Sequence, residues 1–180
     1  MLWTLLWIVV GIVVLVLLAA LVFWALGKQV PEEHTASVSM TLDKTPEEVF
    51  IVIDDVASQP SWDPGTNKVE KLGDRSGREA FRLTCGRNSF VVETTTRVVP
   101  KRITRTIADD AKFFSGEWAW ELTPSADRRS CVVKLTETGR VPHAIPRAMM
   151  KHFFGYHHYM EKTMGALAAK FGEQARFTRG

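Results

Sequence analysis

The sequence predicts an α+β protein in which a curved antiparallel sheet of about seven strands packs around a long C-terminal helix, preceded by one N-terminal transmembrane helix. Three observations lead to this prediction. The chain starts with an uncharged apolar run, continues with short segments in which apolar and polar residues alternate, and ends in an apolar stripe at helical spacing. Alternation is typical of strands with one buried face, and such a stripe is typical of a helix that covers that face.

The N-terminal run from Leu2 to Leu26 contains 25 residues and no charge, which is enough to cross a bilayer core of about 30 Å. Aromatic residues of the kind that favour the membrane interface flank it: Trp3 and Trp7 at one end, Phe23 and Trp24 at the other. We therefore predict a transmembrane anchor over residues 1–27 and a short polar tether over residues 28–34.

A cleaved signal peptide is the alternative for this run. No basic residue precedes the apolar stretch, and the stretch is longer than a signal peptide requires. Ala25 and Gly27 nevertheless form a small-x-small pattern, so cleavage stays open. With one such run, we expect a single-pass membrane protein. Lys28 follows the run and weakly favours a cytoplasmic position for the soluble domain.

The composition of the rest of the chain is that of a soluble domain. All 23 basic and 20 acidic residues of the 180-residue chain lie after residue 27, and the net charge is only +3. No basic cluster with interleaved aromatics occurs, which argues against nucleic-acid binding. Cys85 and Cys131 lie in apolar-alternating segments, so we expect buried free thiols and no disulfide framework.

The domain itself is predicted over residues 35–175, with a tail at residues 176–180. Thr35 to Leu42 alternates cleanly and predicts a strand. Thr45 is a good N-cap, Pro46 suits the first turn, and Glu48 completes a capping box. A short helix should therefore run to Asp54 or Asp55, followed by a turn-rich stretch in which Trp62 is a buried anchor.

Six further strands are predicted, and the short Gly-, Asp- and Pro-rich turns between them favour an antiparallel meander. They are Asn67–Leu72, Glu79–Cys85, Ser89–Val99, Arg102–Ala108, Gly116–Thr123 and Ser130–Arg140. One turn begins at Ala108 and includes Asp109 and Asp110. Val98 is assigned to the inner apolar face and Arg97 to the outer polar face. The last element is a helix from Ile145 to Phe171, roughly 40 Å long.

Three motifs resemble the START-like helix-grip superfamily (SRPBCC), which includes polyketide cyclases/dehydrases and lipid-transport proteins. They are Thr45-Pro46-Glu47-Glu48-Val49-Phe50, the stretch from Asp54 to Trp62-Asp63-Pro64, and the segment GEWAWELTP from Gly116 to Pro124. The similarity extends in element order from Ala36 to Phe171. It implies an elongated apolar cavity between sheet and helix, and binding or transfer of lipids or other hydrophobic molecules. The N-terminal run departs from the typically soluble members.

The residues predicted to line the cavity come from the apolar face of the sheet and from the helix stripe. They are Phe81, Phe90, Val92, Trp118, Trp120, Met149, Phe153, Tyr156 and Met160. Two polar residues join them: Arg105, which lies in register with apolar neighbours, and His152, which lies one helical turn before Tyr156. The sequence has no metal-binding or nucleophile motif, so we expect no cofactor, no metal and no assigned catalytic residue.

The sequence thus favours a non-enzymatic, membrane-tethered domain that binds or transfers a lipid or other hydrophobic small molecule. A cyclase- or dehydratase-type enzyme is the first alternative, and it would depend on Arg105, His152 and Tyr156. The second is a protein-interaction module whose cavity is filled by its own side chains. Phe154 lies opposite the apolar stripe, and if exposed it is a candidate for contact with a membrane or partner.

Overall fold

The computed structural model describes residues 2–75, 77–108 and 114–180 and divides into two compact units. The anchor unit comprises the chain up to Glu32 together with Val141–Gly155, and the sheet unit comprises Glu33–Arg140 together with Tyr156–Gly180. The second half of the anchor unit therefore interrupts the sheet unit in sequence. Asp109 and Asp110 of the predicted turn lie outside the described residues.

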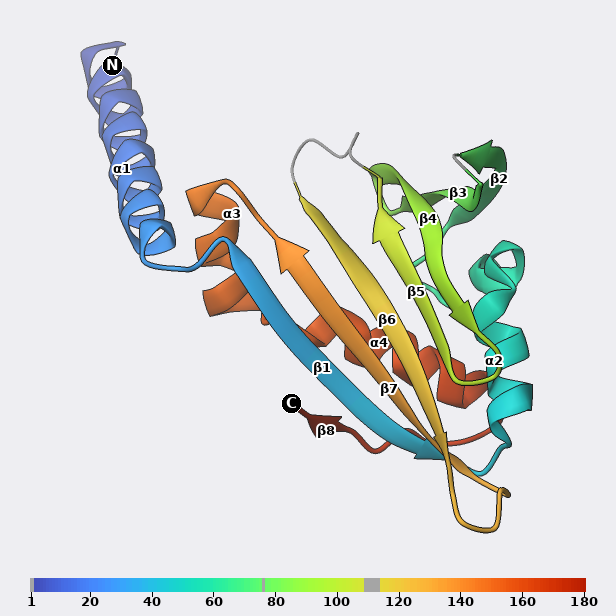
Figure 1. The fold of residues 1–180 in the computed structure, drawn as a ribbon. Coiled ribbons are helices and arrows are strands. Elements are labelled where there is room, and N and C mark those ends of the chain that lie inside the picture. Colours follow the sequence, from blue (N-terminus) through green and yellow to red (C-terminus); the bar gives the residue numbers. More distant parts are fainter. Residues whose placement is uncertain (1, 76, 109–113) are drawn as a thin grey trace. The chain divides into compact units, whose positions relative to one another are not determined.

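The sheet unit contains one antiparallel sheet with the strand order β2-β3-β4-β5-β6-β7-β1-β8 (Figure 1). Its strands are β1 (Glu33–Leu42), β2 (Lys68–Arg75), β3 (Arg78–Cys85), β4 (Asn88–Val98), β5 (Arg102–Ile107), β6 (Ser115–Pro124), β7 (Cys131–Arg140) and β8 (Thr178–Arg179). β2 to β7 form the predicted meander, and β1 closes against β7. The eighth strand, β8, was not predicted; it forms from the presumed tail and pairs with β1.

The short helix α2 (Pro46–Asp54) starts as its sequence predicts. The Thr45 side chain accepts a hydrogen bond from the Glu48 backbone N–H, and the Glu48 carboxylate accepts one from the Thr45 N–H at 2.8 Å. These two bonds satisfy N–H groups that have no partner within a helix. The turn-rich stretch forms a 3₁₀ helix, η1 (Val56–Ser61). Trp62, predicted to be a buried anchor, packs against the core but is only partly buried.

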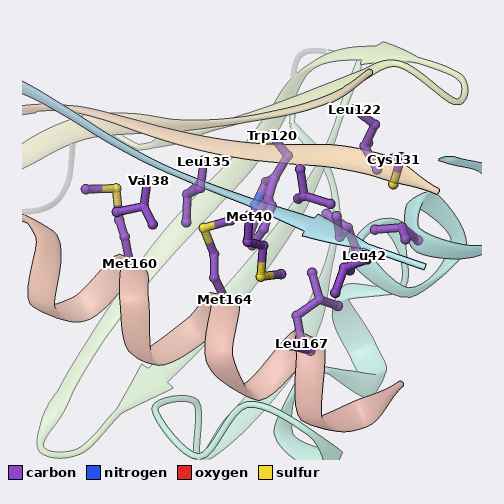
Figure 2. Packing of buried hydrophobic residues seen from close by; sticks show 14 of the residues in the cluster. Val38, Met40, Leu42, Trp120, Leu122, Cys131, Leu135, Met160, Met164 and Leu167 are labelled. Atoms are coloured by element: carbon purple, nitrogen blue, oxygen red, sulfur yellow. The ribbon is translucent and has the colours of Figure 1, made fainter. Parts of the chain in front are cut away.

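The main core lies between the sheet and helix α4 (His157–Lys170). Figure 2 shows Met160, Met164 and Leu167 of α4 directed at Val38, Met40 and Leu135 of the sheet. All three α4 residues are fully buried. The helix stripe of the sequence is therefore correct over α4. A second cluster, built around Val56, Phe81, Leu83, Val92 and Ile107, fills the space at the β3–β5 side.

An irregularity in β4 changes the faces of two residues. Thr94 pairs with Arg105 and Thr96 pairs with Thr104, which leaves Thr95 as an extra residue in β4. Such a bulge reverses the alternation beyond it. The assignment of Val98 to the inner face is therefore wrong, because Val98 is exposed. Arg97 was assigned to the outer face, but it reaches Asp54 of α2 instead.

The predicted continuous helix from Ile145 to Phe171 is also wrong. The chain forms three segments there: α3 (Ala144–Met149), a π-helical turn η2 (Met150–Phe154), and then α4. Gly155 separates η2 from α4 with φ 71° and ψ 151°. This conformation is nearly restricted to glycine and does not belong to a helix. The stripe passes through Gly155 without revealing the break, because side-chain periodicity does not report backbone torsions.

The anchor unit consists of α1 (Leu2–Lys28), α3 and η2. α1 is long and apolar enough to cross a membrane, and its most apolar window is not buried at all. α3 packs on its C-terminal end, where a Cβ atom on Gly27 would lie 1.8 Å from the Ala144 carbonyl oxygen. Only glycine allows this approach. The Arg147 guanidinium, which is buried, donates from Nε to the Gly27 carbonyl at 3.1 Å and pairs with Glu32 at 3.0 Å.

Candidate functional site

A small cavity lies within the sheet unit, between β3–β7 and one face of α4. Its volume is about 60 Å³. Its lining is mostly apolar and aromatic: Gln59, Leu83, Phe90, Val92, Arg105, Trp118, Trp120, Leu135, Tyr159 and Thr163. Pockets for drug-sized ligands usually have about 300–1,000 Å³. The side chains therefore fill most of the space between helix and sheet, and they leave room for a small group beside a few polar atoms.

Arg105 is the charged member of this lining, and it is only 8% exposed. One of its guanidinium nitrogens, Nη2, donates to the Ile53 carbonyl at 2.8 Å and more weakly to that of Asp54 at 3.4 Å. These carbonyls belong to the last turn of α2 and lack partners within the helix. Arg105 Nε is buried and has no acceptor among the described residues. Arg105 therefore lines an apolar cavity and has a buried donor without a partner among the described residues.

The charge on Arg105 is not neutralised by a direct ion pair among the described residues. The two carboxylates whose charges act on Arg105, Asp54 and Glu79, are bound by Arg97 at 2.9 Å and 2.6 Å. Burial lowers the pKa of Arg105 to about 10, an effect that the charge on Asp54 opposes. At neutral pH Arg105 is still cationic, and a buried cation of this kind is stabilised by an anion or a hydrogen-bond acceptor.

Tyr159 and Thr163 supply the polar atoms from α4. They are one helical turn apart, so they lie on the same face. Tyr159 as a whole is 39% exposed, but its hydroxyl is 4.0 Å from the sulfur of Cys85. Burial of this hydroxyl raises the pKa of Tyr159, and burial likewise raises the pKa of the Cys85 thiol. Both groups are neutral hydrogen-bonding groups at physiological pH.

A second polar cluster lies behind Trp118. The indole Nε1 of Trp118 donates to Glu137 at 2.9 Å, and the other carboxylate oxygen of Glu137 lies 3.2 Å from His34 Nε2. The His34 ring stacks on Tyr156 with ring centroids 4.2 Å apart. These contacts fix the orientation of Trp118, which is part of the cavity wall. They also give each carboxylate oxygen of Glu137 a partner.

The structure brings five of the eleven predicted site residues together at the cavity: Phe90, Val92, Arg105, Trp118 and Trp120. Three others belong to the sheet unit but lie elsewhere. Phe81 belongs to the second core cluster, Met160 is part of the main core, and Tyr156 stacks on His34. The remaining three, Met149, His152 and Phe153, belong to the anchor unit. None of these three lines the cavity, and Met149 and Phe153 line a separate groove within the anchor unit.

Five cavity residues were not among the predicted site residues: Gln59, Leu83, Leu135, Tyr159 and Thr163. Tyr159 and Thr163 had a detectable signal, because they form a polar i, i+4 pair directly beside the methionine stripe of α4. Gln59 lies in η1, and its amide donates to Asp63 and Thr66 at 3.0 Å. No periodicity points to a residue in such a turn. Among the described residues, no group of three His, Cys, Asp or Glu side chains could hold a metal ion.

An open surface groove of about 480 Å³ lies between α2, η1 and the β2–β4 edge of the sheet. It differs from the cavity in its charged rim. Glu79 accepts hydrogen bonds from both Lys71 and Arg97 there, at 2.7 Å and 2.6 Å. Lys71, Glu79 and Arg97 thus satisfy one another, and the exposed carboxylate of Asp55 is a further charged group of this lining.

Comparisons with solved structures agree with this architecture. A START-superfamily protein from Mycobacterium smegmatis is 19% identical, with a TM-score of 0.65, over 76% of this chain and 96% of its own. The Zhui aromatase/cyclase from a Streptomyces species is 15% identical, with a TM-score of 0.63, over 77% and 93%. A conserved protein from Geobacillus kaustophilus is 15% identical, with a TM-score of 0.64, over 80% and 99%. At such identities the similarity establishes the fold alone.

Sequence comparison establishes the family. No curated protein sequence matches the chain significantly. A sequence model of one protein family matches residues 33–172, which include every element from β1 to α4. The order of these elements, the antiparallel sheet and the helix that covers it are those implied by the resemblance in the sequence. The chain therefore belongs to the polyketide cyclase / dehydrase and lipid transport family.

Proposed function

We propose that the sheet unit binds a hydrophobic small molecule or lipid whose polar end carries an anionic or hydrogen-bond-accepting group, and that α1 holds it at a membrane. The observation that carries this proposal is Arg105, a buried cation in the lining of an apolar cavity, whose Nε donor has no acceptor in the part of the chain that the structure describes. Family membership supports a hydrophobic ligand. A buried guanidinium binds a carboxylate or phosphate strongly, and the aromatic lining of the cavity suits the apolar body.

The cavity volume limits the ligand. About 60 Å³ suits the polar end of a ligand, so a compact aromatic acid needs modest side-chain movement and a long-chain lipid needs much more. The same small volume favours, as the second candidate, a protein-interaction module with a filled cavity. An enzyme is less well supported, because Tyr156 does not line the cavity and His152 belongs to the anchor unit.

The packing of the anchor unit supports a permanent membrane anchor and disfavours a cleaved signal peptide. Removal of α1 would take away the Gly27 carbonyl that accepts from the buried Arg147. It would also expose Ala144, which fits against Gly27. The small-x-small pattern at Ala25 and Gly27 thus has a structural explanation. Lys28, at the end of α1, favours placement of the soluble part on the cytoplasmic side.

The test is calorimetric titration of the full chain in phosphatidylcholine nanodiscs with naphthoic acid and with naphthalenemethanol, its uncharged counterpart. We expect the acid to bind more tightly. Arg105→Gln should weaken binding of the acid by roughly tenfold or more, the value of one buried charged hydrogen bond. It should leave binding of the alcohol nearly unchanged. Decanoic acid, titrated in parallel, tests whether the cavity opens for an alkyl chain.

Arg102→Gln is the matched control, because Arg102 lies on the same strand but is exposed, with its guanidinium 3.7 Å from the Glu121 carboxylate. Arg105→Lys retains the charge should Arg105→Gln fail to fold. The proposal is wrong if no probe binds and native mass spectrometry of the purified chain finds no retained apolar molecule. That result would favour the interaction module.

A further inference from the structure

The anchor unit carries an apolar surface outside α1. Four large side chains on α3 and η2 are exposed within the anchor unit: Ile145, Met149, Phe153 and Phe154. Phe153 is 67% exposed and Phe154 is 57% exposed. With Ala20 and Phe23 of α1 they line a groove of about 360 Å³ that contains no polar residue. An apolar surface this continuous on a short segment indicates contact with lipid or another apolar partner.

The direction of the segment identifies the partner. Ala144 opposes Gly27 at the C-terminal end of α1, whereas the Phe153 ring lies 5.7 Å from that of Phe23. The segment therefore runs back along α1 from its end toward its middle. Phe23 and Ala20 precede Gly27 by four and seven residues, which corresponds to about 6 and 10 Å along a helix. If α1 spans a bilayer, this depth is that of the boundary between headgroups and acyl chains.

Basic side chains accompany the apolar ones on α1 and η2. Lys28 ends α1, with its ammonium 5.5 Å from the Trp24 ring, and Lys151 and His152 of η2 are exposed. A helix with basic residues beside exposed aromatic ones is typical of elements that lie in the membrane interface. The free apolar surface of α3 and η2 is also continuous with the lipid-facing surface of α1 through the shared groove.

We infer that α3 and η2 form a second membrane-contacting element, in which Phe153 and Phe154 insert into the acyl-chain boundary of the leaflet at the C-terminal end of α1. The occupant of the apolar groove is lipid. This inference rests on the proposed membrane anchor. It adds that the chain meets the bilayer twice, the second time between β7 and α4, in the connection that joins the sheet to its covering helix.

The test is spin-label accessibility in the full chain, reconstituted into vesicles of equimolar phosphatidylcholine and phosphatidylglycerol. Single labels are placed by Leu15→Cys, Lys151→Cys, Phe154→Cys and Val132→Cys in a Cys85→Ser, Cys131→Val background. The label's collisions with two relaxing agents are compared: oxygen, which concentrates in lipid, and a nickel chelate, which stays in water. We expect the ratio of oxygen to nickel collisions at Phe154 to approach that at Leu15 and to exceed that at Val132, on the sheet, several-fold. Lys151, three residues before Phe154, should give an intermediate value.

The outcomes separate the inference from the proposal beneath it. A label at Leu15 that contacts water would overturn the membrane anchor itself. A label at Leu15 in lipid with Phe154 as water-accessible as Val132 would overturn only the second contact. Phe154 is more than half exposed, so its replacement removes little packing. Circular dichroism of each labelled variant checks that the fold is kept.

Discussion

Tyr159 is a cavity residue whose buried hydroxyl makes the stability of the folded protein depend on pH. Its hydroxyl lies beside the Cys85 sulfur, and burial raises its pKa above the ordinary value of 10.0. A raised pKa means that the folded protein holds the proton more tightly than the unfolded chain. The resulting stability is complete below about pH 10 and is lost as pH rises above it.

Tyr159→Phe removes this titration while keeping the ring. We expect the variant to be slightly less stable than the wild type at neutral pH, because the contact with Cys85 is lost. The difference in free energy of unfolding between wild type and variant should shrink or reverse between about pH 9 and about pH 11. In this range Tyr159 of the wild type loses its proton when the chain unfolds, which favours the unfolded state, and the variant has no such group. Urea unfolding of both proteins in detergent, at a series of pH values, measures this difference in the free energy of unfolding. A constant difference across this range would contradict the assigned burial of the hydroxyl.

At the residue scale, the sequence located the strand side of the cavity well and the helix side poorly. Phe90, Val92, Trp118 and Trp120 follow from alternation, because their strands are regular at these positions and alternate residues then share one face. The faces of helix residues are harder to assign, since side chains one residue apart differ by only 100° in direction and neighbouring stripes can both face the sheet. The predicted stripe through Met160 marks the core, and the neighbouring face, with Tyr159, marks the cavity.

Elements with local signals were predicted closely. The capping box around Thr45 and Glu48 fixes the start of α2 through two short-range hydrogen bonds, and turn residues fix the strand ends. Features that depend on tertiary packing were not predictable. The bulge at Thr95 has no residue signature, and nothing local distinguishes Gly155 as a helix break from Gly165, which lies inside α4.

These two glycines provide a matched test at the scale of elements. A Cβ on Gly155 would meet no neighbour within 4 Å, so the cost of Gly155→Ala is purely the strain of its positive φ, about 1–3 kcal/mol. Amides in residues 150–155 should exchange hydrogen roughly 5- to 150-fold faster. Mass spectrometry of the exchanged full chain measures this.

Gly165→Ala is the opposite case. Its new methyl group would lie 3.7 Å from the Phe177 ring, an ordinary contact, in a helical backbone. The substitution should stabilise α4 by about 0.5–1 kcal/mol and slow exchange there. Equal effects of the two substitutions would refute the break at Gly155 and restore a continuous helix.

At the scale of the whole molecule, the anchor unit depends on one close approach. Gly27→Ala would force α1 and Ala144 apart and weaken the bond from Arg147, a charged hydrogen bond of about 1.5–3 kcal/mol. We expect exchange of the α3 amides in nanodiscs to rise at least about tenfold. The sheet amides should be unaffected, because the sheet unit has its own core.

Gly11→Ala is the control, since a Cβ on Gly11 meets nothing within 4 Å. It lies in the same helix and adds the same methyl group. If Gly27→Ala and Gly11→Ala leave the α3 amides equally protected from hydrogen exchange, then the packing of α3 on α1 does not stabilise the anchor unit.

The pairing of β1 with β7 has a consequence for biosynthesis. His34 and Glu137, joined across these strands, are 103 residues apart, so the first strand to be made waits for the last long one. At about 5–20 residues per second the ribosome needs roughly 5–20 s to supply that partner. Throughout this interval β1 has an unpaired edge, and the apolar run before it has already emerged. Early insertion of that run into a membrane would keep nascent chains apart while their sheets are incomplete.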